Sequence, residues 1–279
     1  MKSCNKNRAK PFLRWAGGKT RLIRFLDNHL PKDFSNGNRY YEPFLGAGSL
    51  FFRLKPQKAT LSDNNEDLID CFQAVRKRPN LILKYLRQHL LSTCEEYYYK
   101  MREKYNTSKP SIAKAALFIY LNKTCFNGIW RVNKKGQFNV PYGFKEPPCL
   151  PSRDELFEAS KVLSKARILQ MDYKEIAKYV KQGDFVYFDP PYPPLNGTSN
   201  FTHYTRERFT EKDHYELARI AKIINEIGCY VLISNADTPY IRSLYEDDFN
   251  IFELEVTRWI RTDGKRYKAK EIAITNYDV

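Results

Sequence analysis

The sequence predicts an α/β fold with a mostly parallel sheet, because short apolar, strand-like runs alternate with helical patterns from residue 10 to 70 and again from residue 166 onward. Between these zones the pattern is helical and then rich in Gly, Asn and Pro, which indicates an inserted unit. The expected strands are residues 39–44, 59–61, 167–170, 185–188, 230–234 and 271–275. The expected helices are residues 66–75, 81–91, 112–121 and 211–227.

The composition is that of a basic globular protein. Of the 279 residues, 42% are hydrophobic and 28% are charged, which excludes a disordered or collagenous chain. Lys and Arg number 47 against 32 Asp and Glu, so the formal net charge is +15. Such a surplus favours a polyanionic partner, and nucleic acid is the first candidate.

Several classes of protein are excluded. The longest strongly apolar stretch, residues 115–121, is far shorter than the ~20 residues that a membrane-spanning helix needs. Residues 1–10 are polar and basic and carry no secretory signal. None of the 6 cysteines forms a Cys-x-x-Cys pair, so neither a zinc site nor a disulfide framework is indicated. We therefore expect a soluble, cytoplasmic protein with no membrane partner and no metal.

Two glycines, Gly46 and Gly48, follow the expected strand at 39–44 and precede a helical pattern. Glycines in such a turn let the backbone approach a ligand closely. Phe51 stands where a dinucleotide fingerprint has its third glycine, so the sequence disfavours NAD or FAD. A different nucleoside ligand and a purely structural turn both remain open.

Asp63 follows the run 59–62, where the second strand of a doubly wound sheet would end. An acidic side chain at this place accepts hydrogen bonds from ribose hydroxyls, and the spacing suits an adenosyl cofactor. The alternative is a helix N-cap, since Ser62, Asp63 and Asn64 precede the expected helix at 66–75.

The most informative segment is Asp189-Pro190-Pro191-Tyr192, directly after the expected strand at 185–188. The prolines lack backbone donors, so they leave carbonyl oxygens and one carboxylate facing the crevice at the edge of the sheet. Asp189 and the Pro190 carbonyl would accept the two N–H groups of an exocyclic nucleobase amine while Tyr192 stacks on the ring. A proline-terminated strand with a surface tyrosine is the alternative.

Seven segments occur in an order that resembles the Dam-type DNA adenine N6-methyltransferases, a family that includes the GATC modification enzymes of restriction systems. The segments are residues 12–19, 42–48, 62–63, 126–133, 137–143, 189–192 and 270–272. Each is short, but their joint order is specific and the similarity spans nearly the whole chain. The resemblance implies a Rossmann-like S-adenosylmethionine-dependent methyltransferase core at residues 1–70 and 165–279. It also implies a mainly helical target-recognition domain at residues 71–164, which carries a β-hairpin loop.

The resemblance further implies S-adenosylmethionine as the cofactor and Asp189, Pro190 and Tyr192 as the catalytic residues. We expect base flipping and direct in-line methyl transfer to N6 of adenine in double-stranded DNA, within GATC, without a metal or a covalent enzyme intermediate. The implied cofactor-binding residues are Trp15, Lys19, Pro43, Gly46, Gly48, Asp63 and Asp189, with Asp172 and Tyr173 added by weaker analogy at the edge of the cofactor's adenine.

Turn signals predict a DNA-reading loop between the helical stretch and residue 141. Asn127-Gly128 is a hairpin signal, and Lys134-Lys135-Gly136 indicates a second turn. Arg131 is the expected guanine reader, because arginine pairs bidentately with guanine O6 and N7; a solvated arginine is the alternative. The other expected DNA contacts are Phe126, Ile129, Asn133, Asn139 and Pro141.

A second basic segment, residues 258–270, surrounds Asp263-Gly264 and predicts a hairpin loop that contacts DNA phosphates. A solvated loop is the alternative. The expected contacts here are Arg261, Lys265, Arg266 and Lys268.

Other functions remain open at this point. An N4-cytosine or an RNA adenine methyltransferase would use a similar acceptor-Pro-Pro-aromatic motif, and a DNA-binding protein without catalysis would use the same charge and hairpin. A NAD-dependent enzyme is the weakest alternative. We expect a monomer of bacterial or phage origin with double-stranded DNA as its partner, and a separately acting restriction endonuclease is left open.

Overall fold

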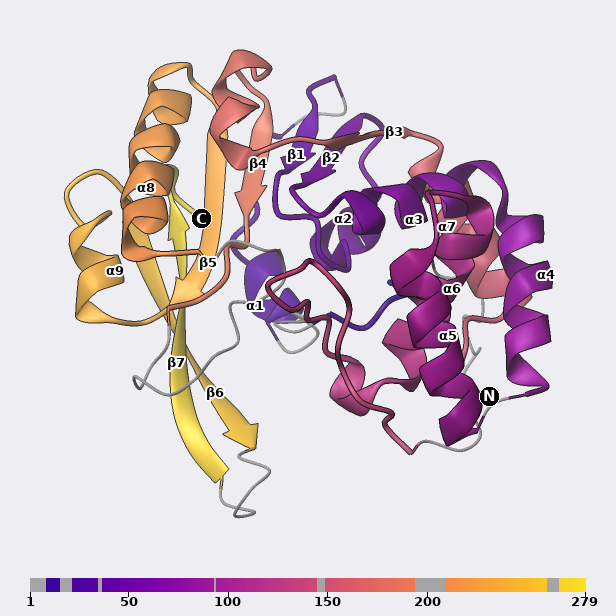
Figure 1. Ribbon diagram of the computed structural model, residues 1–279. Coiled ribbons are helices and arrows are strands. Elements are labelled where there is room, and N and C mark those ends of the chain that lie inside the picture. Colours follow the sequence, from indigo (N-terminus) through magenta and orange to yellow (C-terminus); the bar gives the residue numbers. More distant parts are fainter. Residues whose placement is uncertain are drawn as a thin grey trace, which may run out of the picture.

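The structure is a computed structural model that describes residues 9–15, 22–34, 37–92, 94–144, 149–193, 209–259 and 266–279. The strands in this part of the chain are β1 (Tyr40–Glu42), β2 (Ala59–Asp63), β3 (Ala166–Gln170), β4 (Phe185–Phe188), β5 (Tyr230–Ala236), β6 (Asn250–Trp259) and β7 (Arg266–Thr275). They form one sheet in the order β3-β2-β1-β4-β5-β7-β6 (Figure 1). The pairs among β1 to β5 are parallel, whereas β7 runs antiparallel to both β5 and β6.

Helices surround this sheet unevenly. They are α1 (Ile23–Asp27), α2 (Ser49–Leu54), α3 (Glu66–Lys77), α4 (Pro79–Leu90), α5 (Glu95–Thr107), α6 (Ile112–Thr124), α7 (Arg153–Leu163), α8 (Glu211–Glu226) and α9 (Pro239–Ser243), with 3-10 turns η1 (Phe126–Gly128) and η2 (Tyr173–Lys178). Figure 1 shows α8 and α9 at one side of the sheet and α4 to α7 gathered at the opposite side of the molecule. Among the described residues, no helix combines the length and the hydropathy that crossing a membrane requires.

Each face of the sheet buries its own apolar cluster, as a parallel sheet covered on both faces requires. Strand β4 shows the division, because successive side chains of a strand point to opposite faces. Phe185 and Tyr187 belong to one cluster, whereas Val186 and Phe188 belong to the other. All four side chains are buried, which explains the continuous apolar run that predicted this strand.

The helical unit shares one of these clusters with the sheet. Leu61 of β2 and Phe185 of β4 lie in the same buried cluster as Phe118 of α6 and Leu156 of α7. Helix α3 packs against α6 and α7 and thereby joins the unit to the sheet. The boundary expected between residues 70 and 71 lies inside α3.

The expected strands and helices are all present, with ends shifted by a few residues. Strand β6 and helices α1, α5, α7 and α9 were not expected as elements, although the basic segment at 258–270 predicted the hairpin to which β6 belongs. The signal for α7 was nevertheless present, because Ser152 and Glu155 form a capping box at its start. The signal for β6 was the alternation of half-buried Phe252 and Leu254 with exposed Glu253 and Glu255.

The order of the parallel strands reverses between β1 and β4, which are neighbours in the sheet. In open α/β sheets such a reversal opens a crevice beyond the carboxyl ends of the strands, and ligands bind there. The segments that follow β1 and β4 therefore face the same crevice.

Candidate active site

The loop after β1 carries two glycines in left-handed conformations, Gly46 with φ of +47° and Gly48 with φ of +67°. A Cβ atom at Gly46 would lie 2.9 Å from Cδ1 of Trp15, so the loop also needs glycine there for space. Gly48 is the N-cap of α2, and both glycines are buried. The conformation of this loop thus depends on its sequence, as the Gly-x-Gly pattern predicted.

Trp15 connects this loop to the helical unit. The buried amide of Asn122 holds the preceding residue, because Oδ1 accepts from Arg14 N at 2.8 Å and Nδ2 donates to Arg14 O at 2.6 Å. The indole of Trp15 is stacked with the rings of Phe118 and Trp130. The distances between ring centroids are 6.2 Å and 6.3 Å. Trp15 therefore lies between the loop after β1 and the buried side chains of α6.

Asp63 lies at the carboxyl end of β2 and contacts the same loop. Its Oδ2 accepts from Gly46 N at 3.1 Å, and its Oδ1 accepts from Asn65 N at 3.0 Å. Burial raises the pKa of Asp63 to about 6, against the lowering effect of these N–H donors. The side chain that caps α3 is that of Asn65, which accepts from Leu68 N, so Asp63 is not the N-cap.

Glu42, the last residue of β1, is a buried carboxyl group that the sequence analysis did not single out. Its Oε2 accepts from Tyr40 Oη at 2.9 Å and from Phe51 N, in the first turn of α2, at 3.2 Å. Burial raises the pKa of Glu42 to about 8, and the nearby Asp189 and Asp63 carboxylates add to the rise. A charged residue at the end of a buried strand, just before a glycine turn, was the available signal.

The segment after β4 brings its polar groups to the crevice. Pro190 is buried, whereas Asp189 and Tyr192 are half-buried. Asp189 Oδ1 accepts a hydrogen bond from Ser234 Oγ at 2.8 Å. Tyr192 Oη donates to Oε2 of Glu271 on β7 at 3.4 Å. Both Asp189 and Tyr192 are therefore held by residues from the neighbouring strands β5 and β7.

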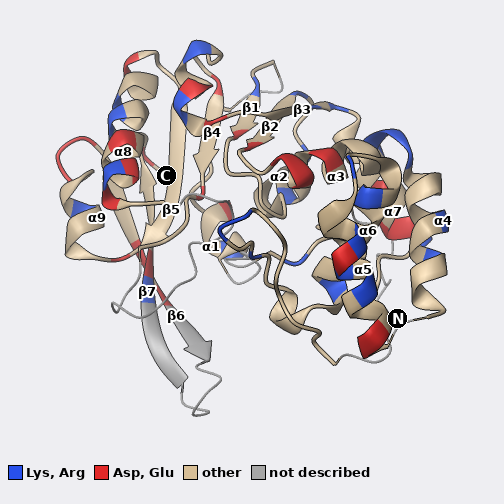
Figure 2. Cartoon of the chain, viewed as in Figure 1, with Lys and Arg blue, Asp and Glu red and all other residues tan. Residues whose placement is uncertain are grey.

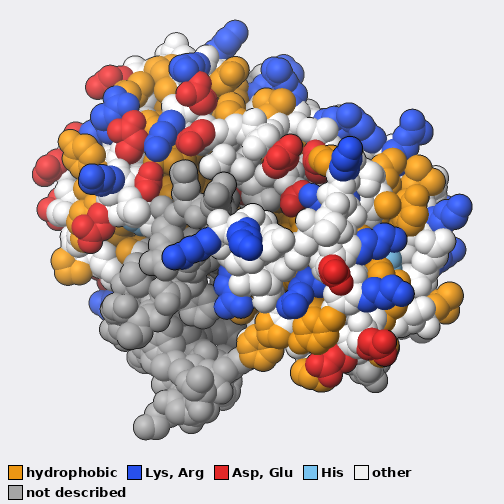
Figure 3. Space-filling model, in the orientation of Figure 1, with side chains coloured by type: hydrophobic (Ala, Val, Ile, Leu, Met, Phe, Trp, Pro, Cys, Tyr) orange, Lys and Arg blue, Asp and Glu red, His pale blue; other side chains and the backbone are white. Residues whose placement is uncertain are grey.

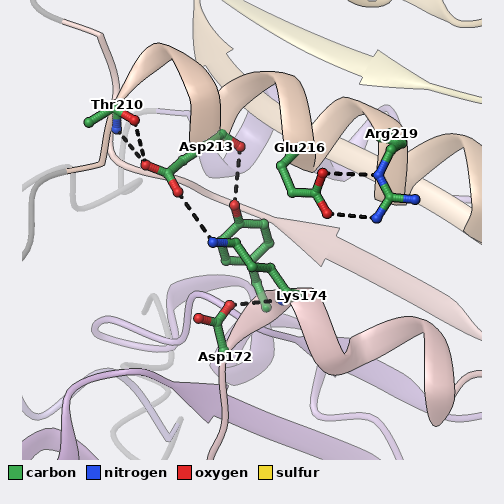
Figure 4. Close-up of polar contacts among 7 residues, drawn as sticks. Asp172, Lys174, Thr210, Asp213, Glu216 and Arg219 are labelled. Carbon is green, nitrogen blue, oxygen red and sulfur yellow. Dashed lines mark hydrogen bonds and ion pairs between the residues drawn. The ribbon is translucent and has the colours of Figure 1, made fainter.

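Asp172 and Tyr173 lie at the start of η2, beyond the end of β3. Figure 4 shows the Asp172 carboxylate next to the Lys174 backbone, where Oδ1 accepts from Lys174 N at 2.9 Å and caps η2. Tyr173 is buried, and its hydroxyl donates to the backbone oxygen of Asp213 at 3.2 Å. The Tyr173 ring stacks on that of Phe44, in the loop after β1, at 5.1 Å. These contacts bring η2 to the same loop as Asp63.

The hairpin of the helical unit turns at residues 133–137, the second of the two expected positions. Gly136 N donates to Asn133 O at 2.9 Å, and Gly136 has a φ of +78°. Antiparallel bridges join Val132 to Phe138 and Cys125 to Tyr142.

The Asn127-Gly128 signal does mark a tight turn, since both residues have positive φ. This turn is η1, at the start of the loop, and is not the tip of a hairpin. The Asn127-Gly128 sequence therefore predicts a turn correctly. The hairpin itself reverses at the Lys134-Lys135-Gly136 segment, between the paired residues Val132 and Phe138.

Buried and accessible side chains alternate along this loop. Trp130, Phe138, Val140 and Tyr142 are buried and anchor it to the helices. The DNA contacts expected in this loop remain accessible: Phe126, Arg131 and Pro141 are exposed, and Ile129, Asn133 and Asn139 are half-buried. Within this group, Arg131 Nε donates to Asn139 Oδ1 at 2.9 Å.

Helix α5 holds the returning arm of the hairpin. The Asn106 side chain forms two hydrogen bonds with the backbone of Phe138, at 2.9 and 3.0 Å. Tyr98 Oη donates to Val140 O at 2.9 Å. Sequence reasoning missed both residues, although buried Tyr98, Met101 and Tyr105 have the spacing of one helix face.

Near the C-terminus, β6 and β7 form a long antiparallel ribbon, and the expected phosphate contacts Arg266 and Lys268 belong to β7. β6 and β7 pair from Asn250 and Thr275 as far as Trp259 and Arg266, so the expected hairpin is confirmed up to its tip. Lys19, Arg261 and Lys265 lie outside the described residues, and the side chains of Arg266 and Lys268 in β7 are not described either.

Basic side chains gather around the helical unit. Figures 2 and 3 show Lys and Arg over α4 to α6 and on the loop that follows α6. At the tip of the hairpin, Arg131, Lys134 and Lys135 are all exposed. Across the ranges that the structure describes, no group of three or more His, Cys, Asp and Glu side chains is arranged to hold a metal ion.

Comparison with known proteins identifies the family. Residues 15–260 match the model of the D12 class N6 adenine-specific DNA methyltransferases. The chain is 40% identical over 287 residues to a Type II methyltransferase of Methanocaldococcus jannaschii, covering 96% of this chain and 99% of that protein. It is 37% identical over 283 residues to a Type II methyltransferase of Lactococcus lactis subsp. cremoris, covering 98% and 97%. It is also 37% identical over 270 residues to the DNA adenine methylase of Escherichia coli K12, covering 96% and 94%. The chain belongs to the D12 class of N6 adenine-specific DNA methyltransferases.

Proposed function

We propose that this enzyme transfers the methyl group of S-adenosylmethionine to N6 of the adenine in GATC, in double-stranded DNA. The observation that carries the proposal is the placement of two segments at one crevice. The Gly46-to-Gly48 loop follows β1, and the Asp189-to-Tyr192 segment follows β4, the strand paired with β1 at the reversal of the sheet. The first would hold the cofactor and the second the adenine.

The residues around the crevice fit a cationic cofactor. Asp63 and Asp189 lie close enough to raise the pKa of Glu42, and burial raises the pKa of both Glu42 and Asp63. A sulfonium cation would favour the ionised form of these carboxyl groups, because it opposes the rise in pKa that burial causes. Trp15, Pro43 and the two glycines would line the adenosyl side, Asp172 and Tyr173 would border the adenine, and Lys19 is assigned there by resemblance alone.

The chain's part in the reaction is to aim a weak nucleophile. Adenine N6 reacts poorly because its lone pair is delocalised into the ring. Asp189 and the Pro190 carbonyl would accept both N6 protons, localise the lone pair and direct it at the methyl group, while Tyr192 stacks on the base. When bound, S-adenosylmethionine supplies an activated methyl on a sulfonium leaving group.

The same groups favour base flipping. Stacking contributes about 1–3 kcal/mol per base and a hydrogen bond to a charged acceptor about 1.5–3 kcal/mol. Together they offset the few kcal/mol that extruding a base from the duplex costs. A direct in-line transfer then requires no covalent intermediate with the protein.

Sequence reading is assigned to the helical unit, at residues 71–164. Arg131 would pair with guanine in the major groove, and the exposed Phe126 and Pro141, with Ile129, Asn133 and Asn139, would contact neighbouring bases or the backbone. Arg261, Lys265, Arg266 and Lys268 would contact phosphates. We assign a monomer that acts on DNA in the cytoplasm, either alone as a DNA-marking enzyme or beside a restriction endonuclease.

The test is transfer of labelled methyl from S-adenosylmethionine to a GATC duplex and to a duplex in which only that adenine is replaced, without added metal. Label confined to the intact duplex and recovered as N6-methyladenine supports cofactor, reaction and target. Label on both duplexes contradicts GATC as the site. Absence of label with tight DNA binding would favour a non-catalytic DNA-binding protein.

A variant separates catalysis from binding. Asp189→Ala should abolish transfer while the folded protein still binds DNA, because the substitution removes the acceptor and leaves the hairpin intact. Full activity of Asp189→Ala contradicts the assigned site.

A further inference from the structure

A buried chain of hydroxyl groups leads to the Asp189 carboxylate. In the register of the parallel strands, Phe188 pairs with Ile233, so Asp189 and Ser234 lie level on adjacent strands. Ser234 Oγ is 2.8 Å from Asp189 Oδ1, and Tyr187 Oη is 2.9 Å from the same Ser234 Oγ. Tyr187 and Asp189 lie two residues apart, so both side chains point to the face of the sheet that carries Ser234.

The direction of every hydrogen bond in this chain is fixed by chemistry. Ser234 Oγ donates its single proton to Asp189 Oδ1. The Ser234 oxygen then accepts from Tyr187, which must be the donor. Burial and the nearby Asp189 charge raise the pKa of Tyr187 well above its ordinary value, so Tyr187 keeps this proton.

Burying two hydroxyl groups in the core costs free energy. Ser234 is 0% exposed and Tyr187 is 1% exposed, and an apolar side chain at either place would avoid the loss of water around a hydroxyl. Neither residue is assigned to a ligand in the proposed function. The two hydroxyls instead satisfy each other and end on the carboxylate, which points to a role in orienting it.

We propose that Ser234, oriented by Tyr187, is a positioning residue that fixes the carboxylate of Asp189 for its hydrogen bond with the target amine. This inference rests on the proposed catalytic role of Asp189. Ser234 touches neither the base nor the cofactor in this scheme. Ser234, on β5, donates to Oδ1 of Asp189 and so fixes the orientation of the carboxylate before the base binds. The carboxylate then does not have to be oriented during the reaction.

The experiment measures single-turnover methyl transfer, together with separate dissociation constants for DNA and for cofactor. Ser234→Ala should slow transfer about 10- to 100-fold, by analogy with side chains that orient the ligands of a metal. Both dissociation constants should stay within about threefold of wild type, because the hairpin and the glycine loop are untouched. Ser234→Thr retains the hydroxyl and should recover most of the rate.

Tyr187→Phe supplies the second arm, because it removes one hydroxyl at constant ring size. It should slow transfer less than Ser234→Ala, and the double variant should be no slower than Ser234→Ala alone, since Tyr187 acts only through Ser234. Tyr245→Phe is the matched control: Tyr245 is also a buried tyrosine, its hydroxyl has no hydrogen-bond partner among the described residues, and its loss should leave the rate unchanged.

The outcomes separate this inference from the proposed function. A wild-type rate in Ser234→Ala, additive losses in the double variant, or equal losses in Ser234→Thr and Ser234→Ala each overturn the positioning role. If Asp189→Ala itself remains fully active, the proposed site is wrong and the positioning role is overturned with it. An inactive Asp189→Ala beside a normal Ser234→Ala overturns the positioning role alone.

Discussion

Replacing Glu42 by Gln should stabilise the protein at neutral pH. Glu42 is 2% exposed, and its Oε2 accepts hydrogen bonds from Tyr40 and from the Phe51 backbone. The Gln amide oxygen can accept both, so the substitution keeps these contacts and replaces the ionisable carboxyl group with a neutral amide of nearly the same shape. In the wild type, folding buries a carboxyl group that ionises freely in the unfolded chain, and this costs free energy. The variant does not have this cost.

The magnitude follows from the two pKa values of Glu42. The pKa is about 8 in the fold, against 4.5 in the unfolded chain. Below the lower value both states are protonated, and Glu42 imposes no penalty. As the pH rises, only the unfolded state loses the proton, so folding becomes less favourable by about 1.4 kcal/mol per pH unit. The penalty reaches about 3 kcal/mol at pH 7 and levels off above the folded pKa.

The assay is urea unfolding of wild type and Glu42→Gln at several values between about pH 5 and pH 8, where linkage predicts a growing difference. The variant should be about 1 kcal/mol more stable than wild type at pH 5 and about 3 kcal/mol more stable at pH 7. Glu226→Gln, at an exposed position on α8, is the control and should change stability by less than about 0.5 kcal/mol throughout. A variant that is less stable than wild type at pH 7, or a difference that does not vary with pH, refutes the reasoning.

Three further predictions test other parts of the site. Gly46→Ala should weaken cofactor binding about tenfold in calorimetry, because its Cβ would meet an indole at 2.9 Å, whereas Gly136→Ala has positive φ but open space and should leave cofactor affinity unchanged. Arg131→Ala should lose about 1–3 kcal/mol of discrimination at one guanine, measured with single-base duplex variants; intact discrimination contradicts its role as reader. Tyr192→Phe should retain most of the transfer rate, since it keeps the aromatic face and removes only the hydroxyl group, which donates to Glu271 at 3.4 Å, and Tyr192→Ala should lose about 10- to 100-fold with the stacking face; equal losses would point to the hydroxyl.

The parts of the fold that could be predicted are those whose burial leaves a local pattern. Strand β4 is buried on both faces and is a continuous apolar run, and α8 spaces its apolar residues on one side. Strand β6 was missed because its apolar side chains are only half-buried and mix with charges. Helix α5 was missed because its buried Tyr98, Met101 and Tyr105 are set among charged residues.

The candidate site likewise contains residues that the sequence predicts and residues that it does not. Gly46, Asp63 and Asp189 stand beside turns whose sequence marks the ends of strands, so the fold of an α/β sheet predicts that they meet. The residues that hold them have no such local signal. Ser234 lies 45 positions from Asp189 in the chain, and only the pairing of β4 with β5 brings the two together. The cap of α3 by Asn65 rather than Asp63 likewise depended on where the helix begins.

The shared core of sheet and helices decides how specificity in this protein can be re-engineered. Because Leu61 and Phe185 of the sheet pack in one cluster with Phe118 and Leu156 of the helices, exchanging the entire helical segment for that of a distant relative would cut through a packed interior. Among the described residues, the hairpin, in which buried anchors alternate with accessible side chains, can be changed without cutting through this core. Grafts limited to the outward positions between 126 and 141 should keep the host enzyme intact, whereas whole-segment chimeras should fold poorly unless their inner surfaces are redesigned together.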